Sequence, residues 1–504
     1  MKKGCIYSVG RVLKMMIKMI ESHSLKKNFL YSSILTVSNY LFPMLVFPYV
    51  SRVLGVENIG MCNFVDSIVN YFMLFSMMGI SVMGIREISL SKGNRMEMSR
   101  TFCSLLVLNG IFTIVAFVTL WVITLTVASL QVYRQLLYVS MFKLLGNFLL
   151  IEWFFKGLEN FKYITNRTII VKIGYVVAVF VCVREQDDYV MYYVLTMLMV
   201  LVNALINVFY SIRVISFPIG KIQLRKYVKP FCFLGFYMLL TNMYTSFNII
   251  YLGFVRGPVE VGYYTTATKL YTIIVAFFTA FTSVMLPRMS SLLSENRREE
   301  FLQMVEKAVR ILVSLGVPAV VLCTMYSSQI IHILAGGGYD GAIVPAIIVM
   351  PLLFVIGYEQ IMVIQVLMPS KQDKVVFRNA VAGAVIGVVL NVAAVPSLGA
   401  VGSAIVWVVS ECLVLVLSQV QVTRLYGIKF PLMPLLKTVV VYLPLVLFGG
   451  LLYVLFDNEY TIFTIAIVTS LVYFAIVQMY ILPDTEIRKA MLKIADRLKF
   501  MNAK

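Results

Sequence analysis

Fourteen apolar stretches, most of them long enough to cross a membrane as a helix, constrain this chain more than any other feature of its sequence. A helix takes about 20 apolar residues to cross the hydrocarbon core of a bilayer. These stretches stay apolar along their whole length, whereas membrane strands alternate apolar and polar residues. We therefore predict transmembrane helices over residues 29–52, 59–85, 101–127, 133–156, 168–183, 189–212, 230–254, 259–286, 304–327, 342–368, 376–396, 399–423, 435–456 and 460–482.

The composition agrees with this prediction. Hydrophobic residues make up 60% of the 504 positions and charged residues only 13%. So few charged side chains cannot cover the surface of a water-soluble protein of this size. The predicted fold class is an all-α polytopic membrane protein.

The distribution of Lys and Arg predicts the orientation of the helices. Cytoplasmic loops of membrane proteins carry an excess of these residues. With the N-terminus inside, 34 of the 43 Lys and Arg residues fall on cytoplasmic segments. Both termini are therefore predicted to be cytoplasmic. Topology and attraction to anionic lipid account for the net charge of +19, and no nucleic-acid partner is implied.

A stretch of 17 residues occurs twice, 202 residues apart. SVMGIREISLSKGNRME at 81–97 matches SVMLPRMSSLLSENRRE at 283–299 at nine positions, where chance gives about one. The same offset pairs Gly55 with Gly257 and Gly60 with Gly262. Six helices separate the copies, so the two halves have the same orientation, as in parallel-repeat transporters. This pattern predicts a transporter that works by alternating access.

The repeat also predicts the domain organisation. Two like-oriented six-helix bundles are followed by two additional helices. The predicted segments are a basic cytoplasmic or interfacial N-terminus at 1–28, an N-terminal bundle at 29–213, a basic cytoplasmic linker at 214–229, a C-terminal bundle at 230–426, two additional transmembrane helices at 427–482 and a basic cytoplasmic tail at 483–504.

Polar residues recur at helical spacing in both halves. In span eight they project within about 80° of one another, and the 202-residue offset gives a matching stripe in span two. Small polar residues also hold membrane helices together, which is the alternative for each residue. Because the stripes match, we predict that they line a watery passage. The residues are Asn39, Asn63, Ser67, Asn70, Ser81, Thr241, Thr245, Asn248, Thr265, Thr272, Thr279 and Ser283.

Charged residues within spans are costly and need a partner, water or a function. Lys269 lies on the polar stripe and is predicted to contact an anion, with an ion pair to Asp66 as the alternative. Lys143, within span four, and Arg52, at the outer end of span one, are further candidates for an anionic headgroup. Lys172 and Arg310 lie close enough to the inner face to extend toward the headgroups.

Three acids within spans are candidates to carry a coupling proton: Asp66, Glu359 and Glu411. A structural role beside a nearby cation is the alternative for each. The chain has no nucleotide-binding loop and only two histidines, so neither a catalytic site nor a metal site is predicted. Its seven cysteines show no metal-ligand spacing. No cofactor is expected, and transport is expected to use a gradient or run downhill.

Four segments resemble a known family. FPYVSRVLG at 47–55, EWFFKGLENFKYIT at 152–165, GYYTTATKL at 262–270 and MLPRMSSL at 285–292 are similar to Wzx-type polysaccharide repeat-unit flippases. These proteins belong to the multidrug/oligosaccharidyl-lipid/polysaccharide exporter superfamily. The resemblance implies a fold like that of multidrug and toxin extruders, with 14 helices.

By this resemblance, the substrate is a short glycan linked through pyrophosphate to a polyprenol in the bacterial inner membrane. Lys269 would then contact the pyrophosphate, while Asn and Thr side chains bond sugar hydroxyls. Cavities of the family are often more cationic in the second helix, where this chain has Asp66 and Ser67, so Lys143 is expected to compensate. A polysaccharide polymerase and chain-length proteins are implied partners.

Three alternatives remain from the residues. A cation-coupled drug exporter of the same superfamily usually has twelve spans, so spans thirteen and fourteen argue against it. A glycan polymerase or ligase needs a substantial outer loop, which is missing from the predicted topology. A membrane scaffold does not explain the polar stripes.

Overall fold

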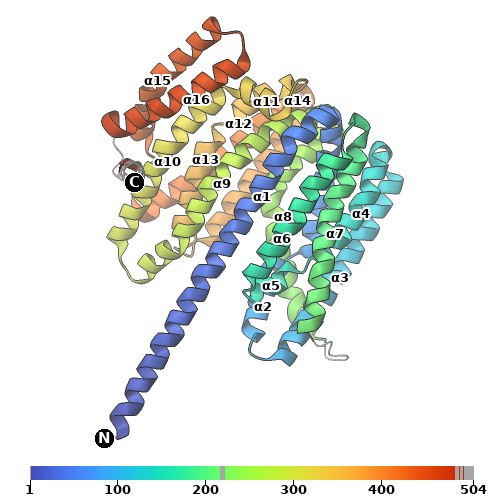
Figure 1. Cartoon of the computed structure of the whole chain (residues 1–504), viewed down its shortest axis with the longest axis vertical. Helices are drawn as coiled ribbons and strands as arrows, with labels where there is room; N and C mark the ends of the chain where they lie inside the picture. Colours follow the sequence, from blue (N-terminus) through green and yellow to red (C-terminus); the bar gives the residue numbers. More distant parts are fainter. Residues whose placement is uncertain (1, 216–221, 483–486, 489–491, 493–504) are drawn as a thin grey trace, which may run out of the picture. The chain divides into compact units, whose positions relative to one another are not determined.

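Figure 1 shows the computed structural model, which describes residues 2–215, 222–482, 487–488 and 492. Within the helices, the side chains of a subset of residues are not described, namely 2–26, 29, 237, 240–246, 270, 273, 276–284 and 286–287. The described part of the chain contains helices and no strand. The predicted all-α fold is confirmed.

The helices follow one another with short connections. They are α1 (Lys2–Met77), α2 (Ile80–Ser91), α3 (Arg95–Thr126), η1 (Ala128–Tyr133), α4 (Arg134–Leu149), α5 (Glu152–Gly157), α6 (Phe161–Cys182), η2 (Gln186–Asp188), α7 (Tyr189–Val214), α8 (Leu224–Arg256), α9 (Pro258–Ser294), α10 (Arg298–Met325), α11 (Ser327–Ala335), η3 (Asp340–Ala342), α12 (Ile343–Val349), α13 (Leu352–Gln360), η4 (Ile361–Leu367), α14 (Asp373–Tyr426), α15 (Leu432–Leu455), α16 (Glu459–Ile476) and η5 (Val477–Ile481).

Ten helical segments among the described residues are long and apolar enough to cross a membrane. Two of them, Leu30–Ser91 and Asp373–Tyr426, each contain two of the predicted spans. The chain is therefore a multi-pass membrane protein, although the predicted count of fourteen spans is not confirmed.

Several predicted spans contain breaks in the helix that are not apparent from their apolar sequence. Span two is divided at Met78, and span four at Ile151, where φ is positive at a residue other than glycine. Span ten is interrupted at Pro351, between α12 and α13. Proline cannot donate the helical hydrogen bond of its position, which explains that last break. Hydropathy alone does not reveal such breaks, because the residues around them are as apolar as the helices.

The chain forms two compact units. Unit 1 comprises residues 1–53 and 68–239, and unit 2 comprises 54–67 and 240–504. The six segments predicted from the repeat remain a prediction. In unit 1, α3, α4, α6 and α7 lie side by side (Figure 1). Trp153 packs directly on Gly84, where a Cβ atom would come within 2.6 Å of the indole, so α5 lies against α2.

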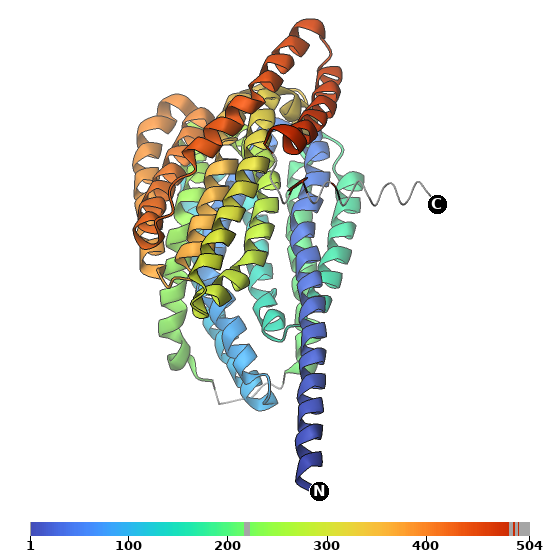
Figure 2. The ribbon, with the colours of Figure 1, turned by 90° about the vertical axis from the view of Figure 1, so that its left-hand side faces the viewer.

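Unit 2 has its core around α9, α10, α13 and η4; α15 packs on α10, and α16 packs on α15 and α11. Figure 2 shows α15 and α16, in red, as a hairpin. One end of this hairpin is fixed by His332 on α11. Its Nδ1 lies 2.7 Å from the Glu459 carboxylate at the start of α16, and its Nε2 lies 2.8 Å from that of Asp340. Tyr453 on α15 donates a hydrogen bond of 2.7 Å to Gln329.

Candidate functional site

Residues related by the 202-residue offset pack against each other inside unit 2. The Asn63 amide on α1 donates a hydrogen bond of 2.9 Å to the hydroxyl of Thr265 on α9, its repeat counterpart. A Cβ atom on Gly60 would come within 1.8 Å of the Pro258 carbonyl oxygen and 2.9 Å of the backbone nitrogen of Gly262. A residue that touches its own counterpart lies on the axis that relates the two copies. This contact therefore marks a local two-fold axis.

Gly55 and Gly257 share one backbone conformation. Gly55 interrupts α1 with φ 74° and ψ 173°, and Gly257 precedes α9 with φ 87° and ψ −177°. Glycine adopts positive φ without the steric cost that a Cβ atom imposes. The repeat that was visible in the sequence is thus also present in the backbone.

Lys269 lies half-buried on α9. The Asp66 carboxylate on α1 is close enough to interact electrostatically with its ammonium group. The neighbouring hydroxyls of Ser67 and Thr272 each donate to the backbone carbonyl four residues earlier in their own helix. Lys269 therefore has an acid nearby, which is the arrangement that the sequence left open as the alternative.

A buried chain of polar side chains joins α8, α9 and α14. Asn248 is 1% exposed, accepts a hydrogen bond from Asn391 and donates one of 3.4 Å to the Tyr264 hydroxyl. Buried hydrogen-bond chains of this kind fix the relative positions of helices. Asn248 thus connects three helices of unit 2.

Two of the predicted coupling acids form a pair in unit 2. Glu359 on α13 and Glu411 on α14 lie close enough for their carboxyl groups to interact with each other. Glu411 is 3% exposed and also accepts a hydrogen bond of 3.0 Å from the Trp407 indole. Two carboxylates that face each other away from water repel, and a proton shared between them removes this repulsion. The π-helical segment η4 follows directly, and such segments are frequent at functional sites.

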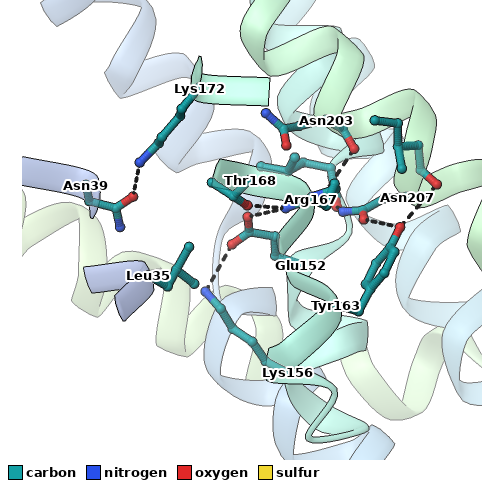
Figure 3. A network of polar contacts seen from close by, with 12 residues as sticks. Leu35, Asn39, Glu152, Lys156, Tyr163, Arg167, Thr168, Lys172, Asn203 and Asn207 are labelled. Carbon is teal, nitrogen blue, oxygen red and sulfur yellow. Dashed lines mark hydrogen bonds and ion pairs between the residues drawn. The ribbon is translucent and has the colours of Figure 1, made fainter. Parts of the chain in front are cut away.

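Unit 1 contains a buried lysine near the middle of a membrane helix. Lys172 is the twelfth of the 22 residues of α6 and is 8% exposed. Its ammonium donates to the Asn39 side-chain oxygen at 2.5 Å (Figure 3) and to the Ser38 hydroxyl at 3.4 Å, and both partners lie on α1. It also lies 5.7 Å from the centre of the Phe42 ring. These neighbours are all uncharged.

A second group of charges lies one to two turns nearer the start of α6. The Arg167 guanidinium, 5% exposed, lies 3.1 Å from one oxygen of Glu152, and Lys156 lies 3.1 Å from the other oxygen (Figure 3). Arg167 also donates to the Asn203 carbonyl at 3.2 Å and to the Thr168 hydroxyl at 2.9 Å. One carboxylate thus faces two cations.

Lys172 increases the positive charge of this region. Glu152 is the acid that acts electrostatically on Lys172, and it already pairs with Arg167 and Lys156. Three cations therefore share one carboxylate. Because charges inside a membrane protein are expensive unless they are compensated, a surplus of this kind favours an anionic ligand.

The sequence interpretation of Lys172 is wrong. It assumed that span five starts at residue 168, which placed Lys172 close to the inner end. In the structure, α6 starts at Phe161, so Lys172 lies about 17 Å along the helix at 1.5 Å per residue. Its side chain bonds to α1 instead of extending to the headgroups. Sequence reasoning also missed the charged site around Glu152 and Lys156. The signal was present, because both residues belong to the family-like segment EWFFKGLENFKYIT at 152–165.

Two predicted headgroup contacts have other neighbours. The Lys143 ammonium on α4 lies 5.3 Å from the centre of the Tyr193 ring on α7, a cation–π geometry. Arg52 is exposed and donates a hydrogen bond of 2.6 Å to the Pro48 carbonyl. A role in headgroup binding stays a prediction for both.

The remaining candidates are scattered over α1, α2, α8 and α9. Asn70 is half-buried, and the Ser81 hydroxyl lies 3.5 Å from the sulfur of Met238. The side chains of Thr241, Thr245, Thr279 and Ser283 lie outside the described ones. The predicted passage therefore remains a prediction.

Comparison with known proteins shows the family. The family model described as "Polysaccharide biosynthesis protein" matches residues 25–293, which is more than half of the chain. The chain belongs to the polysaccharide biosynthesis protein family. A second family model, "Lipid II flippase MurJ", matches residues 223–474. The resemblance to Wzx-type flippases of the exporter superfamily is confirmed by these matches.

Two relatives of this family member are described as transporters. A protein of Escherichia coli K12, provisionally described as an O-antigen transporter, is 25% identical over 396 residues, which cover 78% of this chain and 95% of that protein. A Shigella dysenteriae protein with the same description is 26% identical over 275 residues. These residues cover 53% of this chain and 68% of that protein. The prediction of a transporter rather than an enzyme agrees with these descriptions.

Solved structures support the fold. A lipid II flippase MurJ in an inward closed conformation superposes with a TM-score of 0.75 at 14% identity, covering 90% of this chain and 98% of that one. An inward-facing multidrug transporter of the same superfamily gives 0.59 at 14% identity, covering 77% and 96%. At such low identity, these likenesses establish the fold alone.

Proposed function

We propose that this family member moves polyprenyl-pyrophosphate-linked oligosaccharide units from the cytoplasmic to the outer leaflet of the bacterial inner membrane, by alternating access. The product would supply the synthesis of O-antigen, capsule or exopolysaccharide. Membership of the family and the relatives described as O-antigen transporters support this assignment. Both termini are expected in the cytoplasm, where the excess of Lys and Arg falls.

The observation that carries the proposal is the buried positive surplus in unit 1. Lys172 is held by the neutral side chains of Asn39 and Ser38, in the middle of α6. A pyrophosphate oxygen offers Lys172 a stronger, charge-assisted partner than an amide oxygen does. We therefore propose that Lys172 contacts the pyrophosphate after Asn39 releases it. Arg167 and Lys156 would keep the surrounding potential positive.

The other anion candidates are ranked below Lys172. Lys269 shares its surroundings with Asp66, which already offsets its charge. Lys143 interacts with an aromatic ring and Arg52 with a backbone carbonyl. We retain all three as contacts made while the headgroup enters or leaves. The sugars would be bonded by the predicted Asn and Thr side chains of the passage.

Leaflet transfer by purified protein in proteoliposomes tests the proposal, with a labelled lipid-linked oligosaccharide as substrate. A hydrogen bond to a charged group contributes about 1.5–3 kcal/mol, so Lys172→Gln should slow transfer by about 10- to 100-fold. Lys172→Arg should keep part of the rate. The matched control is Lys162→Gln, an exposed lysine of the same helix, which should transfer at the parental rate. Equal transfer by Lys172→Gln and the parent would contradict the assignment of Lys172.

We also propose that transport is coupled to protons through Glu359 and Glu411. A proton shared between the two neighbouring carboxyl groups would remove their repulsion, and losing it would place two negative charges side by side inside unit 2. Release of the proton would therefore force α13 and α14 apart, and binding would bring them together. Asp66 is the weaker candidate because Lys269 offers it a cation.

A pH gradient across the proteoliposome membrane tests the coupling. The parent should transfer substrate faster with the gradient than without it. Glu359→Gln and Glu411→Gln should keep downhill transfer and lose the acceleration. If Asp66→Asn loses the acceleration while both Gln variants keep it, the coupling site is Asp66 and the pair is structural. No transfer by the parent, with or without the gradient, would instead contradict the flippase assignment.

A flippase product remains lipid-linked, so another protein must consume it. We expect a polysaccharide polymerase and chain-length proteins on the outer side to act next. No cofactor is needed for the proposed transport cycle.

A further inference from the structure

A cavity of about 420 Å³ lies between α10, α15 and the end of η5 in unit 2. Its wall is apolar over most of its extent and carries a few polar groups. The lining residues that matter here are Arg310 and Glu306 of α10, Lys437 and Thr438 of α15, and Leu482. This volume falls within the ordinary range of pockets for small ligands.

The two cations come from different helices and converge on one cavity. Arg310 and Lys437 are both exposed at the protein surface. Within the described part of the chain, neither side chain has an ion pair or a hydrogen bond to another residue. Glu306 lines the same cavity, so the three side chains together contribute a net charge of +1.

The position of the cavity along the helices indicates that it lies at the depth of the lipid headgroups on the cytoplasmic side of the membrane. Lys437 lies five residues after the start of α15, and Leu482 directly follows η5, so the cavity that Arg310 also lines lies at the end of the hairpin where α15 begins and η5 ends. Helices α10 and α15 start from segments rich in Lys and Arg, at 287–300 and 424–437. Long basic side chains near the ends of membrane helices extend toward lipid headgroups.

We propose that this cavity binds an anionic phospholipid of the inner leaflet. Basic pockets between transmembrane helices on the cytoplasmic side are suited to anionic lipid headgroups. The phosphate would lie between Arg310 and Lys437, near the Thr438 hydroxyl, and the first acyl carbons would lie against Val313 and Leu482. The lipid would then join the hairpin of α15 and α16 to α10. This site is separate from the proposed transport site and does not depend on the transported substrate.

Removing the negative charge of Glu306 tests whether the cavity binds an anion, because the proposal predicts tighter binding for that variant. A carboxylate in a phosphate site repels the ligand, so Glu306→Gln should strengthen binding of an anionic lipid. Arg310→Gln and Lys437→Gln should each weaken it about fivefold, because each basic residue near a membrane surface contributes about that factor. The matched control is the double variant Lys374→Gln, Arg378→Gln, which removes two exposed cytoplasmic cations outside the cavity.

The experiment measures the thermal stability of the full-length protein in detergent with added phosphatidylglycerol, phosphatidylcholine of the same chains, or inorganic phosphate. Native mass spectrometry of the same samples counts the lipids that stay bound. We expect phosphatidylglycerol to stabilise the parent and the control variant, and the Arg310→Gln, Lys437→Gln double variant to lose this response.

Three outcomes would overturn the proposal. An equal response of the double variant and the parent would show that these cations do not bind the headgroup. An equal effect of phosphatidylcholine would show that the lipid is bound for its chains alone. A full response to inorganic phosphate would show a phosphate site rather than a lipid site. If the double variant does not fold, the Glu306→Gln variant tests the proposal instead. Weaker binding of phosphatidylglycerol by Glu306→Gln than by the parent would contradict a phosphate held in this cavity.

Discussion

Replacing Gly60 with alanine should force α1 and α9 apart where the two repeats meet. The added Cβ atom would lie 1.8 Å from the Pro258 carbonyl oxygen, whereas Cβ atoms rarely come closer than 3.0 Å to another atom. The backbones must therefore separate by about 1.2 Å. Overpacking usually costs about 1–3 kcal/mol, and the upper end applies here because backbone atoms, not a flexible side chain, must move.

A loss of about 3 kcal/mol corresponds to a fall in Tm of roughly 5 to 10 °C for a unit of this size. The measurement is the temperature at which half of the purified protein leaves the monodisperse peak in size-exclusion chromatography. Gly174→Ala in α6 is the matched control, since no atom lies within 4 Å of its Cβ position. That variant should be as stable as the parent or slightly more stable, because alanine is favoured over glycine in a helix.

The counterpart substitution sharpens the test. A Cβ atom on Gly262 would come within 2.3 Å of the Val56 carbonyl oxygen. Gly262→Ala should therefore also destabilise the protein, and the double variant should lose less than the sum, because a single separation of the helices relieves both clashes. A Tm for Gly60→Ala equal to that of Gly174→Ala would refute the described contact.

Two further predictions concern charged side chains. Hydrogen bonds that the His332 ring donates to the carboxylates of Asp340 and then Glu459 raise the pKa of His332 above its ordinary value of 6.5. Because the folded pKa is raised, the stabilisation is complete below pH 6.5 and is lost as the pH rises through the folded value. Tm measured against pH should therefore show the parent above His332→Gln in acid, with a gap that closes in base; a constant gap would contradict the ion pairs. In unit 1, Glu152→Gln should cost about 3 kcal/mol because it leaves the Arg167 charge buried and unpaired. Lys156→Gln should cost under about 1 kcal/mol, since Lys156 is 36% exposed; the reverse order in thermal melts would disprove the charge arrangement.

The helical fold and the repeat could be read from the sequence because both depend on local patterns. The lengths of the apolar runs predict the membrane helices. The glycines paired at a fixed offset predict positions with the same backbone conformation, as Gly55 and Gly257 have. Helix boundaries were harder to predict. Residues 161–167 are polar enough to read as a loop, yet α6 includes them, and this error alone changed the apparent depth of Lys172.

The charged site of unit 1 could not be predicted because it depends on contacts between distant segments. Lys172 and Asn39 are 133 residues apart, and nothing in either stretch indicates the other. Glu359 and Glu411 were each visible as acids in apolar helices, but their pairing depends on how α13 packs on α14. Sequence patterns thus indicate which residues are costly to bury, whereas packing decides which of them meet.

The contact of Gly60 with Pro258 and Gly262, and of Gly262 with Val56, has a consequence for the origin of the chain. Each repeat presents the same surface to the other, which is the defining property of an isologous dimer interface. A half-length protein carrying one copy would therefore meet a second copy of itself through this surface, in parallel orientation. Gene fusion would then have converted a homodimer into a single polypeptide, after which each half was free to acquire its own charges.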